Sequence, residues 1–182
     1  MYMKNISLIL KMMKFWVQKK SPLFEIFMKG KRVLDMGCGE GNLLRKDKNN
    51  IYGIDINKTL IEKLQSEGLL VKYGDATKIP FEDDYFDVVH CRDVIEHLFP
   101  EQAHKMFLEM KRVLKQNGII ILMTPMPKII WNTFGHVRPY PPAAIKKLFR
   151  ETSRESFNSV SGLSIKNIVC LKGSYLMIIQ KT

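Results

Sequence analysis

The chain has 182 residues, with 29 Lys and Arg against 18 Asp and Glu, which gives a formal net charge of +11 at pH 7. This length and a hydrophobic fraction of 46% suit one globular domain over residues 1–182, with a sizeable core. No apolar run approaches the roughly 20 residues of a membrane-spanning helix, and no signal-peptide pattern is present. The three widely spaced cysteines argue against a disulfide framework and indicate reduced thiols. These features predict a cytoplasmic protein.

The positive charge is concentrated at the two ends, in residues 1–32 and 138–182, whereas the middle of the chain is close to neutral. Basic ends of this kind can meet nucleic acid, an anionic lipid surface or an acidic substrate. A solvated, lysine-rich surface has the same composition, so the charge alone leaves these alternatives open.

The first 30 residues are expected to form a helical extension. Residues 5–18 place apolar side chains at helical spacing with lysines on the far side, which indicates an amphipathic helix. Such a helix can pack on the domain or cover a pocket, and its basic character also fits a membrane surface. Breaks at Ser21-Pro22 and Gly30 enclose a short second helical segment.

From residue 31 the sequence alternates between short apolar runs and helical patterns. Strands are expected at residues 31–35, 51–55, 69–73, 86–91 and 119–123. Helices are expected at residues 42–46, 58–65, 100–114 and 143–150. Asn57 is expected to cap the second of these helices, and Asn117-Gly118 to form a turn after the third. Alternating strands and helices predict βαβ units and a parallel sheet.

Two last strands are expected at residues 164–171 and 175–180, on either side of Lys172-Gly173-Ser174. This spacing predicts a hairpin. A hairpin at the end of a parallel sheet requires one antiparallel strand. The sequence therefore predicts an α/β fold with a mostly parallel seven-stranded sheet.

Residues 33–41 read V-L-D-M-G-C-G-E-G, an apolar strand followed by three alternating glycines. Gly37, Gly39 and Gly41 allow a tight turn that a ligand can approach closely. A dinucleotide fingerprint would need Gly or Ala where Asn42 stands. The charge of Asp35 would repel a pyrophosphate and attract a ligand with an ammonium group. The pattern D-x-G-x-G-x-G resembles motif I of class I S-adenosylmethionine-dependent methyltransferases.

This resemblance implies a Rossmann-like three-layer sandwich with an antiparallel last strand, and S-adenosyl-L-methionine as cofactor. It continues at the carboxyl ends of later strands, where ligands bind in parallel sheets. By resemblance, Asp55 would accept the ribose hydroxyls and Ile56 would pack on adenine. Asp75 would take the exocyclic amino group, Ala76 would offer its N–H to a ring nitrogen, and His90 would lie over the methionine part. Asp55 could instead be an acidic strand end that faces water.

The acceptor pocket is expected from the long loop at residues 125–142, which exceeds a typical connection and suggests a lid over the site. Trp131, His136, Arg138 and Tyr140 are its candidate pocket residues. His136 is a weak candidate for a catalytic base, and Arg138 could hold an acidic group. Both side chains could instead brace the lid by hydrogen bonds to the body of the domain. No catalytic motif is expected, because methyl transfer requires a base only when the nucleophile arrives protonated.

The leading hypothesis is methyl transfer to a small-molecule or lipid-like acceptor. A nucleic-acid methyltransferase is the alternative that the basic ends suggest, although the fourth strand lacks the [D/N]-P-P-[Y/F] segment of amino-group methylases. A non-catalytic binding module is a third reading. No metal site is expected, since the histidines lack the spacing and partners of a zinc site. The segment Glu96-His97-Leu98 resembles one in the family but also suits capping or surface roles. A homodimer could complete a lightly covered pocket.

Overall fold

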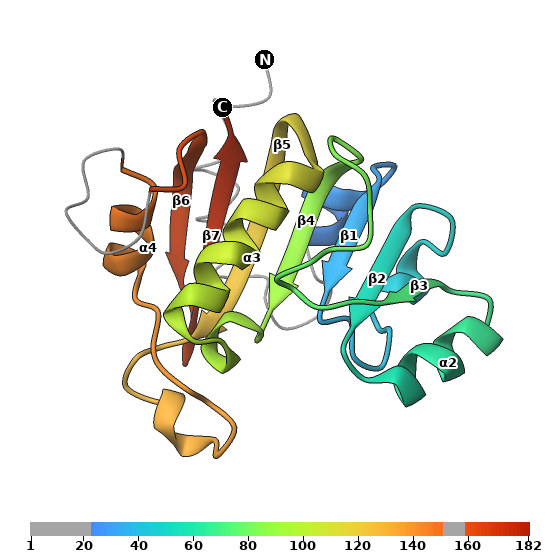
Figure 1. Cartoon of the computed structure of the whole chain (residues 1–182), viewed down its shortest axis with the longest axis horizontal. Coiled ribbons are helices and arrows are strands. Elements are labelled where there is room, and N and C mark those ends of the chain that lie inside the picture. The colour runs from blue at the N-terminus through green and yellow to red at the C-terminus, as the bar shows by residue number, and fades with distance from the viewer. Residues whose placement is uncertain (1–22, 151–158) are drawn as a thin grey trace.

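A computed structural model describes residues 23–150 and 159–182, which form a seven-stranded sheet in the order β3-β2-β1-β4-β5-β7-β6 (Figure 1). The strands are β1 (Val33–Met36), β2 (Ile51–Asp55), β3 (Leu70–Tyr73), β4 (Phe86–Arg92), β5 (Leu114–Pro125), β6 (Leu163–Cys170) and β7 (Ser174–Lys181). The first five pair in parallel, whereas β7 runs antiparallel to both of its neighbours. The predicted fold class, strand count and antiparallel last strand are confirmed.

The central strands of the sheet are buried on both faces, whereas the edge strands β3 and β6 are partly exposed. In β1, Val33 and Leu34 point to opposite faces, because successive side chains alternate along a strand, and both are fully buried. Leu34 belongs to the hydrophobic cluster that also holds the apolar residues of the helix at residues 100–113. Val33 belongs to a second cluster on the other face. A sheet covered on both sides explains why its strands read as continuous apolar runs.

In the described part of the chain, three α-helices flank the sheet, namely α2 (Lys58–Ser66), α3 (Pro100–Val113) and α4 (Pro142–Leu148). Figure 1 shows α3 lying across the sheet over β4 and β5, with α2 at the β3 edge. Asn57 caps α2 as expected, accepting a hydrogen bond from the Leu60 N–H at 3.2 Å. Short π- and 3-10 turns complete the set: η1 (Phe24–Met28), η2 (Leu44–Lys46), η3 (Ile95–His97) and η4 (Ile130–Asn132).

Two local expectations turn out differently. The helix expected at residues 42–46 is only the 3-10 turn η2, because few residues separate the glycine turn from β2. The turn expected at Asn117-Gly118 is a bulge inside β5: Leu114 pairs with Phe86 but the next pair is Ile119 with Val88. Asn117 takes a φ of 64° there, a left-handed conformation that asparagine tolerates.

The expected helix over residues 5–18 lies outside the described residues. Within 23–150 and 159–182, the longest helix is α3, and none is long and apolar enough to cross a bilayer.

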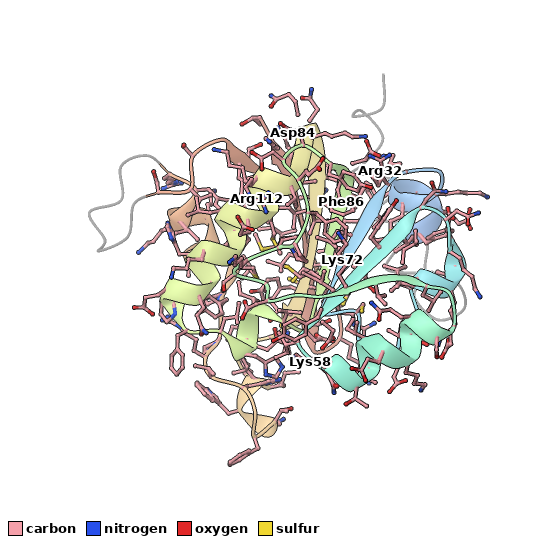
Figure 2. The ribbon with its side chains drawn as sticks, turned by 45° about the vertical axis from the view of Figure 1, so that its right-hand side comes forward. Arg32, Lys58, Lys72, Asp84, Phe86 and Arg112 are labelled. Atoms are coloured by element: carbon pink, nitrogen blue, oxygen red, sulfur yellow. The ribbon has the colours of Figure 1, made fainter. Side chains whose placement is uncertain are left out.

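Arg112 on α3 fastens the loop between β3 and β4, which carries part of the candidate site (Figure 2). Its guanidinium donates two hydrogen bonds to the Glu109 carboxylate at 2.7 Å, one to Asp83, and two to the carbonyls of Phe81 and Ile79. Glu109 in turn accepts the N–H of Ile79 at 2.8 Å. This network holds the loop against the body of the domain.

Candidate cofactor site

The turn after β1 has the tight backbone that its glycines predict. Gly37 has a φ of 73°, and a β-carbon there would lie 2.5 Å from Cγ2 of Val94. Its N–H donates to the carbonyl of Ile54 on the neighbouring strand at 2.9 Å. Gly41 has the same φ, and a β-carbon there would lie 2.8 Å from a methyl of Leu64. The first glycine therefore lets the turn lie close to Val94, in the segment after β4, and the third allows α2 to pack closely.

Asp55 at the end of β2 is held by backbone amides. Its Oδ2 accepts the N–H of Gly39 at 3.0 Å, and its Oδ1 accepts the N–H of Asn57 at 2.9 Å. Each carboxylate oxygen keeps a second lone pair for another donor. The glycine turn therefore fixes the orientation of the carboxylate that the sequence assigned to a ribose.

Asp75 and Ala76 follow β3 in the same region. The Asp75 carboxylate accepts both the N–H and the hydroxyl of Thr77 at 2.7 Å, which fixes its rotamer. Ala76 is buried, whereas Ile56 is 68% exposed. An exposed isoleucine next to two oriented carboxylates offers an apolar surface for a flat ligand.

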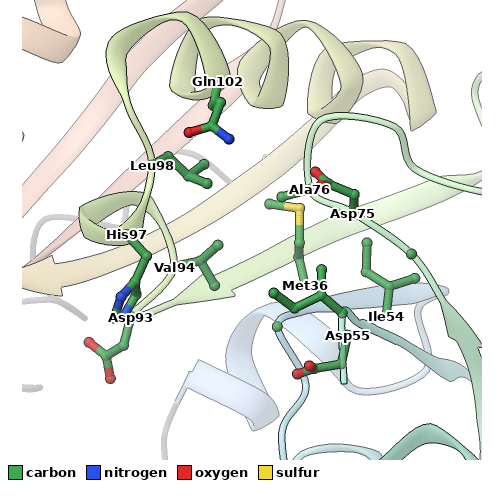
Figure 3. Close-up of a pocket in the computed structure, with 13 residues that line it drawn as sticks. Met36, Ile54, Asp55, Asp75, Ala76, Asp93, Val94, His97, Leu98 and Gln102 are labelled. Atoms are coloured by element: carbon green, nitrogen blue, oxygen red, sulfur yellow. The ribbon is translucent and has the colours of Figure 1, made fainter. Parts of the chain in front are cut away.

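These residues line a cavity of about 390 Å³ at the carboxyl ends of the parallel strands, a volume within the range of small-molecule sites. Figure 3 shows Met36, Ile54, Asp55 and Asp75 on one side and Val94, His97 and Leu98 on the other. The lining residues are Met36, Gly37, Ile54, Asp55, Ile56, Gly74, Asp75, Ala76, Asp93, Val94, His97, Leu98 and Gln102. Five of the nine residues assigned to cofactor binding are among them.

The other four do not line the cavity. Asp35 is buried, and its Oδ1 lies 2.7 Å from Nδ1 of His90 on the adjacent strand β4. Gly39 supports Asp55, and Gly41 packs against α2. The Asp35–His90 pair results from strand register, because β1 and β4 place these two residues side by side.

None of the four residues assigned to the acceptor pocket lines the main cavity. Trp131 is 63% exposed and does not line the cavity. Tyr140 is buried, its hydroxyl donates to the Leu98 carbonyl at 2.8 Å, and burial raises its pKa to about 12. Arg138 lies over the Tyr140 ring, and both line a smaller cavity between α3 and α4. For Arg138 the observed contacts resemble the bracing alternative, and Tyr140, which was expected in the acceptor pocket, is tied to the Leu98 carbonyl.

His136 lies instead beside the segment after β4. Its ring centroid is 4.9 Å from that of His97, which lines the main cavity. Glu96, the neighbour of His97, is fully buried, and burial raises the pKa of its carboxyl above the usual value. Sequence reasoning missed this cluster because His136 is far from Glu96-His97 in the sequence. The resemblance of the segment Glu96-His97-Leu98 to the family was the one signal that pointed to it.

Comparison with known proteins places this geometry in a family. Residues 34–122 match the model of the methyltransferase domain. A ubiquinone/menaquinone biosynthesis C-methyltransferase of Vibrio campbellii is 32% identical over 108 residues, which cover 52% of this chain and 41% of that protein. A tRNA (carboxymethyluridine(34)-5-O)-methyltransferase of Arabidopsis thaliana is 29% identical over 106 residues, covering 57% of this chain and 26% of that protein.

The chain spans less than half the length of the curated relatives that it matches. Among solved structures, a SAM-dependent methyltransferase of Archaeoglobus fulgidus superposes with a TM-score of 0.65 at 20% identity, covering 96% of this chain and 94% of that one. That likeness extends the fold beyond the matched segment. Residues 34–122 therefore carry a methyltransferase domain, and the chain has the fold of a solved S-adenosylmethionine-dependent methyltransferase.

Proposed function

We propose that this chain transfers a methyl group from S-adenosylmethionine to a small-molecule or lipid-like acceptor. The observation that carries the proposal is the cavity at the carboxyl ends of β1 to β4, where oriented carboxylates, a glycine turn and an exposed Ile56 meet. S-adenosylmethionine needs hydrogen-bond acceptors for its ribose diol, an apolar surface for its adenine and an anionic environment for its positive charge, and this site offers all three.

The residues of the cavity fit the adenosyl part of this cofactor. Asp55 has lone pairs available for the two ribose hydroxyls, and Ile56 offers its apolar side chain to the base. Asp75 and Ala76 are proposed for the amino edge of adenine. The turn at Gly37, with the Asp35–His90 pair behind it, is proposed for the methionine end.

The bound cofactor supplies a methyl group that is already activated on a sulfonium. The chain therefore has to hold an acceptor atom about 3–3.5 Å from that carbon, in line with the breaking bond, and exclude water. The lid at residues 125–142 is proposed for the second task. His136 donates its Nδ1–H to the Ile130 carbonyl at 2.6 Å, so its Nε2 can accept a proton from an acceptor that arrives protonated.

Nucleic acid is the second candidate acceptor, and two observations support it. The excess positive charge lies at the chain ends, and one matched relative is a tRNA methyltransferase. A non-catalytic binding module would keep the cofactor cavity but transfer no methyl group. The acceptor experiment below separates these three cases.

Cofactor binding is tested by calorimetry with S-adenosylmethionine and its demethylated product. We expect Asp55→Ala to weaken binding at least about 10-fold, which corresponds to about 1.4 kcal/mol. Glu62→Ala, on the exposed part of α2 and outside the cavity, is the control and should bind like the parent. A parent chain that binds neither compound, or an Asp55→Ala variant with parental affinity, would contradict the placement.

The acceptor is tested by measuring release of the demethylated cofactor with small molecules, lipid precursors and RNA. Turnover with small molecules supports the proposal. Turnover only with RNA, falling steeply as salt rises, supports the nucleic-acid alternative. Cofactor binding without any turnover supports the binding module.

A further inference from the structure

We propose that Glu96, His97 and His136 form a binding site for one divalent transition-metal ion, with Zn²⁺ the expected occupant. Each of the three residues offers a ligand atom, and these atoms all lie within 4.8 Å of one another. Two imidazoles and one carboxylate form a ligand set that zinc uses in proteins. The site goes beyond the proposed methyl transfer and does not depend on it.

Hydrogen bonds fix the tautomer of both histidines. Nδ1 of His97 lies 2.8 Å from the Gly135 carbonyl, and Nδ1 of His136 lies 2.6 Å from the Ile130 carbonyl. A carbonyl oxygen can only accept, so Nδ1 carries the proton in each ring and Nε2 carries the lone pair. Histidines that bind metals typically donate their other N–H to a carbonyl or carboxylate in this way.

The Glu96 carboxylate lacks a full set of partners. The side chain is completely buried, and its Oε2 accepts the hydroxyl of Thr124 at 3.0 Å. Its Oε1 is buried with no hydrogen-bond partner in the described part of the chain. A buried, unsatisfied carboxylate oxygen is costly, and a metal ion would satisfy it.

The backbone brings the lid to the same place. The Glu96 carbonyl accepts the N–H of Val137 at 2.8 Å and, more weakly, that of Arg138 at 3.4 Å. The residues next to His136 are therefore tied to Glu96 without any metal. An ion held by His136 from the lid and by Glu96-His97 from the body would join these two parts through their side chains as well.

The ligand set also selects the kind of metal. Imidazole nitrogens favour first-row transition metals, whereas Mg²⁺ and Ca²⁺ prefer ligand sets made of oxygens. Three protein ligands leave a tetrahedral Zn²⁺ one position for water or for an oxygen of an acceptor. Since His97 also lines the cavity, the ion would lie at the cavity wall. A metal-bound His136 could not serve as a base, so the two proposed roles of this residue exclude each other.

The test is a titration of the full chain, stripped of metal with a chelator, in the absence of S-adenosylmethionine. Co²⁺ should bind with 1:1 stoichiometry and give the visible absorption of a site with nitrogen and oxygen ligands, and Zn²⁺ should displace it. Mg²⁺ should not compete. Hydrogen exchange in residues 126–137 should slow when Zn²⁺ is added.

His136→Ala and His97→Ala should each weaken Zn²⁺ binding at least about 100-fold, because loss of even an outer partner of a ligand costs about 10–100-fold. His104→Ala removes a histidine from α3 outside the cluster and should keep parental affinity. Glu96→Gln, which keeps the shape of the side chain, should also lose the 1:1 site.

Parental Zn²⁺ affinity in His136→Ala, or binding that Mg²⁺ displaces, would overturn the metal site. Circular dichroism and urea unfolding of each variant exclude unfolding as the cause of lost metal binding. Because the titration contains no methyl donor or acceptor, a failed metal site leaves the proposed function standing. A failed methyl transfer likewise leaves the metal site to be judged by its own data.

Discussion

At the scale of single residues, the glycines of the first turn serve different purposes. Gly37 combines a φ of 73° with a β-carbon position 2.5 Å from the Val94 side chain. Gly39 also has a positive φ, of 47°, but a β-carbon there would meet nothing within 4 Å among the described residues. A side chain at Gly39 would therefore meet backbone strain alone, whereas a side chain at Gly37 would meet both backbone strain and steric overlap.

This contrast gives a prediction for alanine at each position. Gly39→Ala should lower the free energy of unfolding only by the cost of a left-handed conformation, about 1–2 kcal/mol. Gly37→Ala should lower the free energy of unfolding by that cost and by a further amount of about 1–3 kcal/mol for overpacking against Val94. It should also weaken cofactor binding, because Val94 lines the cavity. Urea unfolding and calorimetry measure both effects. Equal stability of the two variants would contradict the steric argument.

A double variant is the control for that prediction. Adding Val94→Ala to Gly37→Ala removes the methyl group that the new β-carbon would meet. The double variant should therefore lose less stability than the sum of the two single changes, since contacting residues are not additive. Additive losses would show that Val94 does not limit the turn.

At the scale of elements, the Arg112 network couples α3 to the loop that carries Asp75 and Ala76. The hydrogen bonds from Arg112 lower the pKa of the Glu109 carboxyl, against the opposing effect of its burial. A carboxyl whose pKa is lower in the folded state stabilises the fold above its unfolded pKa, near 4.3. That stabilisation disappears as the pH falls through the depressed folded value.

Glu109→Gln should therefore destabilise the domain by about 1–3 kcal/mol at pH 7, since hydrogen bonds to charged groups are worth more than neutral ones. The difference from the parent should shrink as the pH falls below about 4.3. Urea unfolding between pH 7 and the acid limit of folding measures it. Glu82→Gln, exposed in the same loop, should show little difference at any pH. A Glu109→Gln effect independent of pH would contradict the ionic origin.

The elements themselves were largely predictable, because their signals are local. The apolar runs, the Asn57 cap and the hairpin around Gly173 predicted most strands and helices within one or two residues of those observed. The exceptions are β5, which begins five residues before the expected strand, and the expected helix at residues 42–46, which is a 3-10 turn. The Arg112 network was not predictable, since it joins α3 to a loop about thirty residues earlier. The bulge at Asn117 shows the same limit: the turn residues were recognised, but pairing with β4 made them part of a strand.

At the scale of the whole molecule, the cofactor cavity depends on the order of strands in the sheet. One wall comes from the ends of β1 and β2 and the segments after β1, β2 and β3, and the other from the segment between β4 and α3 together with the first turn of α3. The sequence predicted the first wall through Asp55 and Asp75, which follow strands directly. It did not predict the second, where Leu98 and Gln102 take part only because β1 and β4 are neighbours. The expected homodimer stays a prediction.

A ligand between the two walls should stabilise the domain as a unit. At a concentration 100 times its Kd, S-adenosylmethionine should add about 2.7 kcal/mol to the free energy of unfolding. For a domain of this size, that corresponds to a rise in Tm of about 5–10 °C. Thermal unfolding with and without the cofactor measures it. Asp55→Ala, at the same cofactor concentration, should show a smaller rise, because its contact lies on the first wall.

The second wall can be tested separately with Leu98→Ala. This change removes apolar contact from the wall next to α3 while leaving the Asp55 carboxylate and the glycine turn in place. If the cofactor spans the cavity, the variant should also show a smaller rise in Tm, although the substitution changes no residue of the first wall. A full rise in Leu98→Ala would mean that the ligand is held by β2 and β3 alone. The strand order would then position the acceptor lid but not the cofactor.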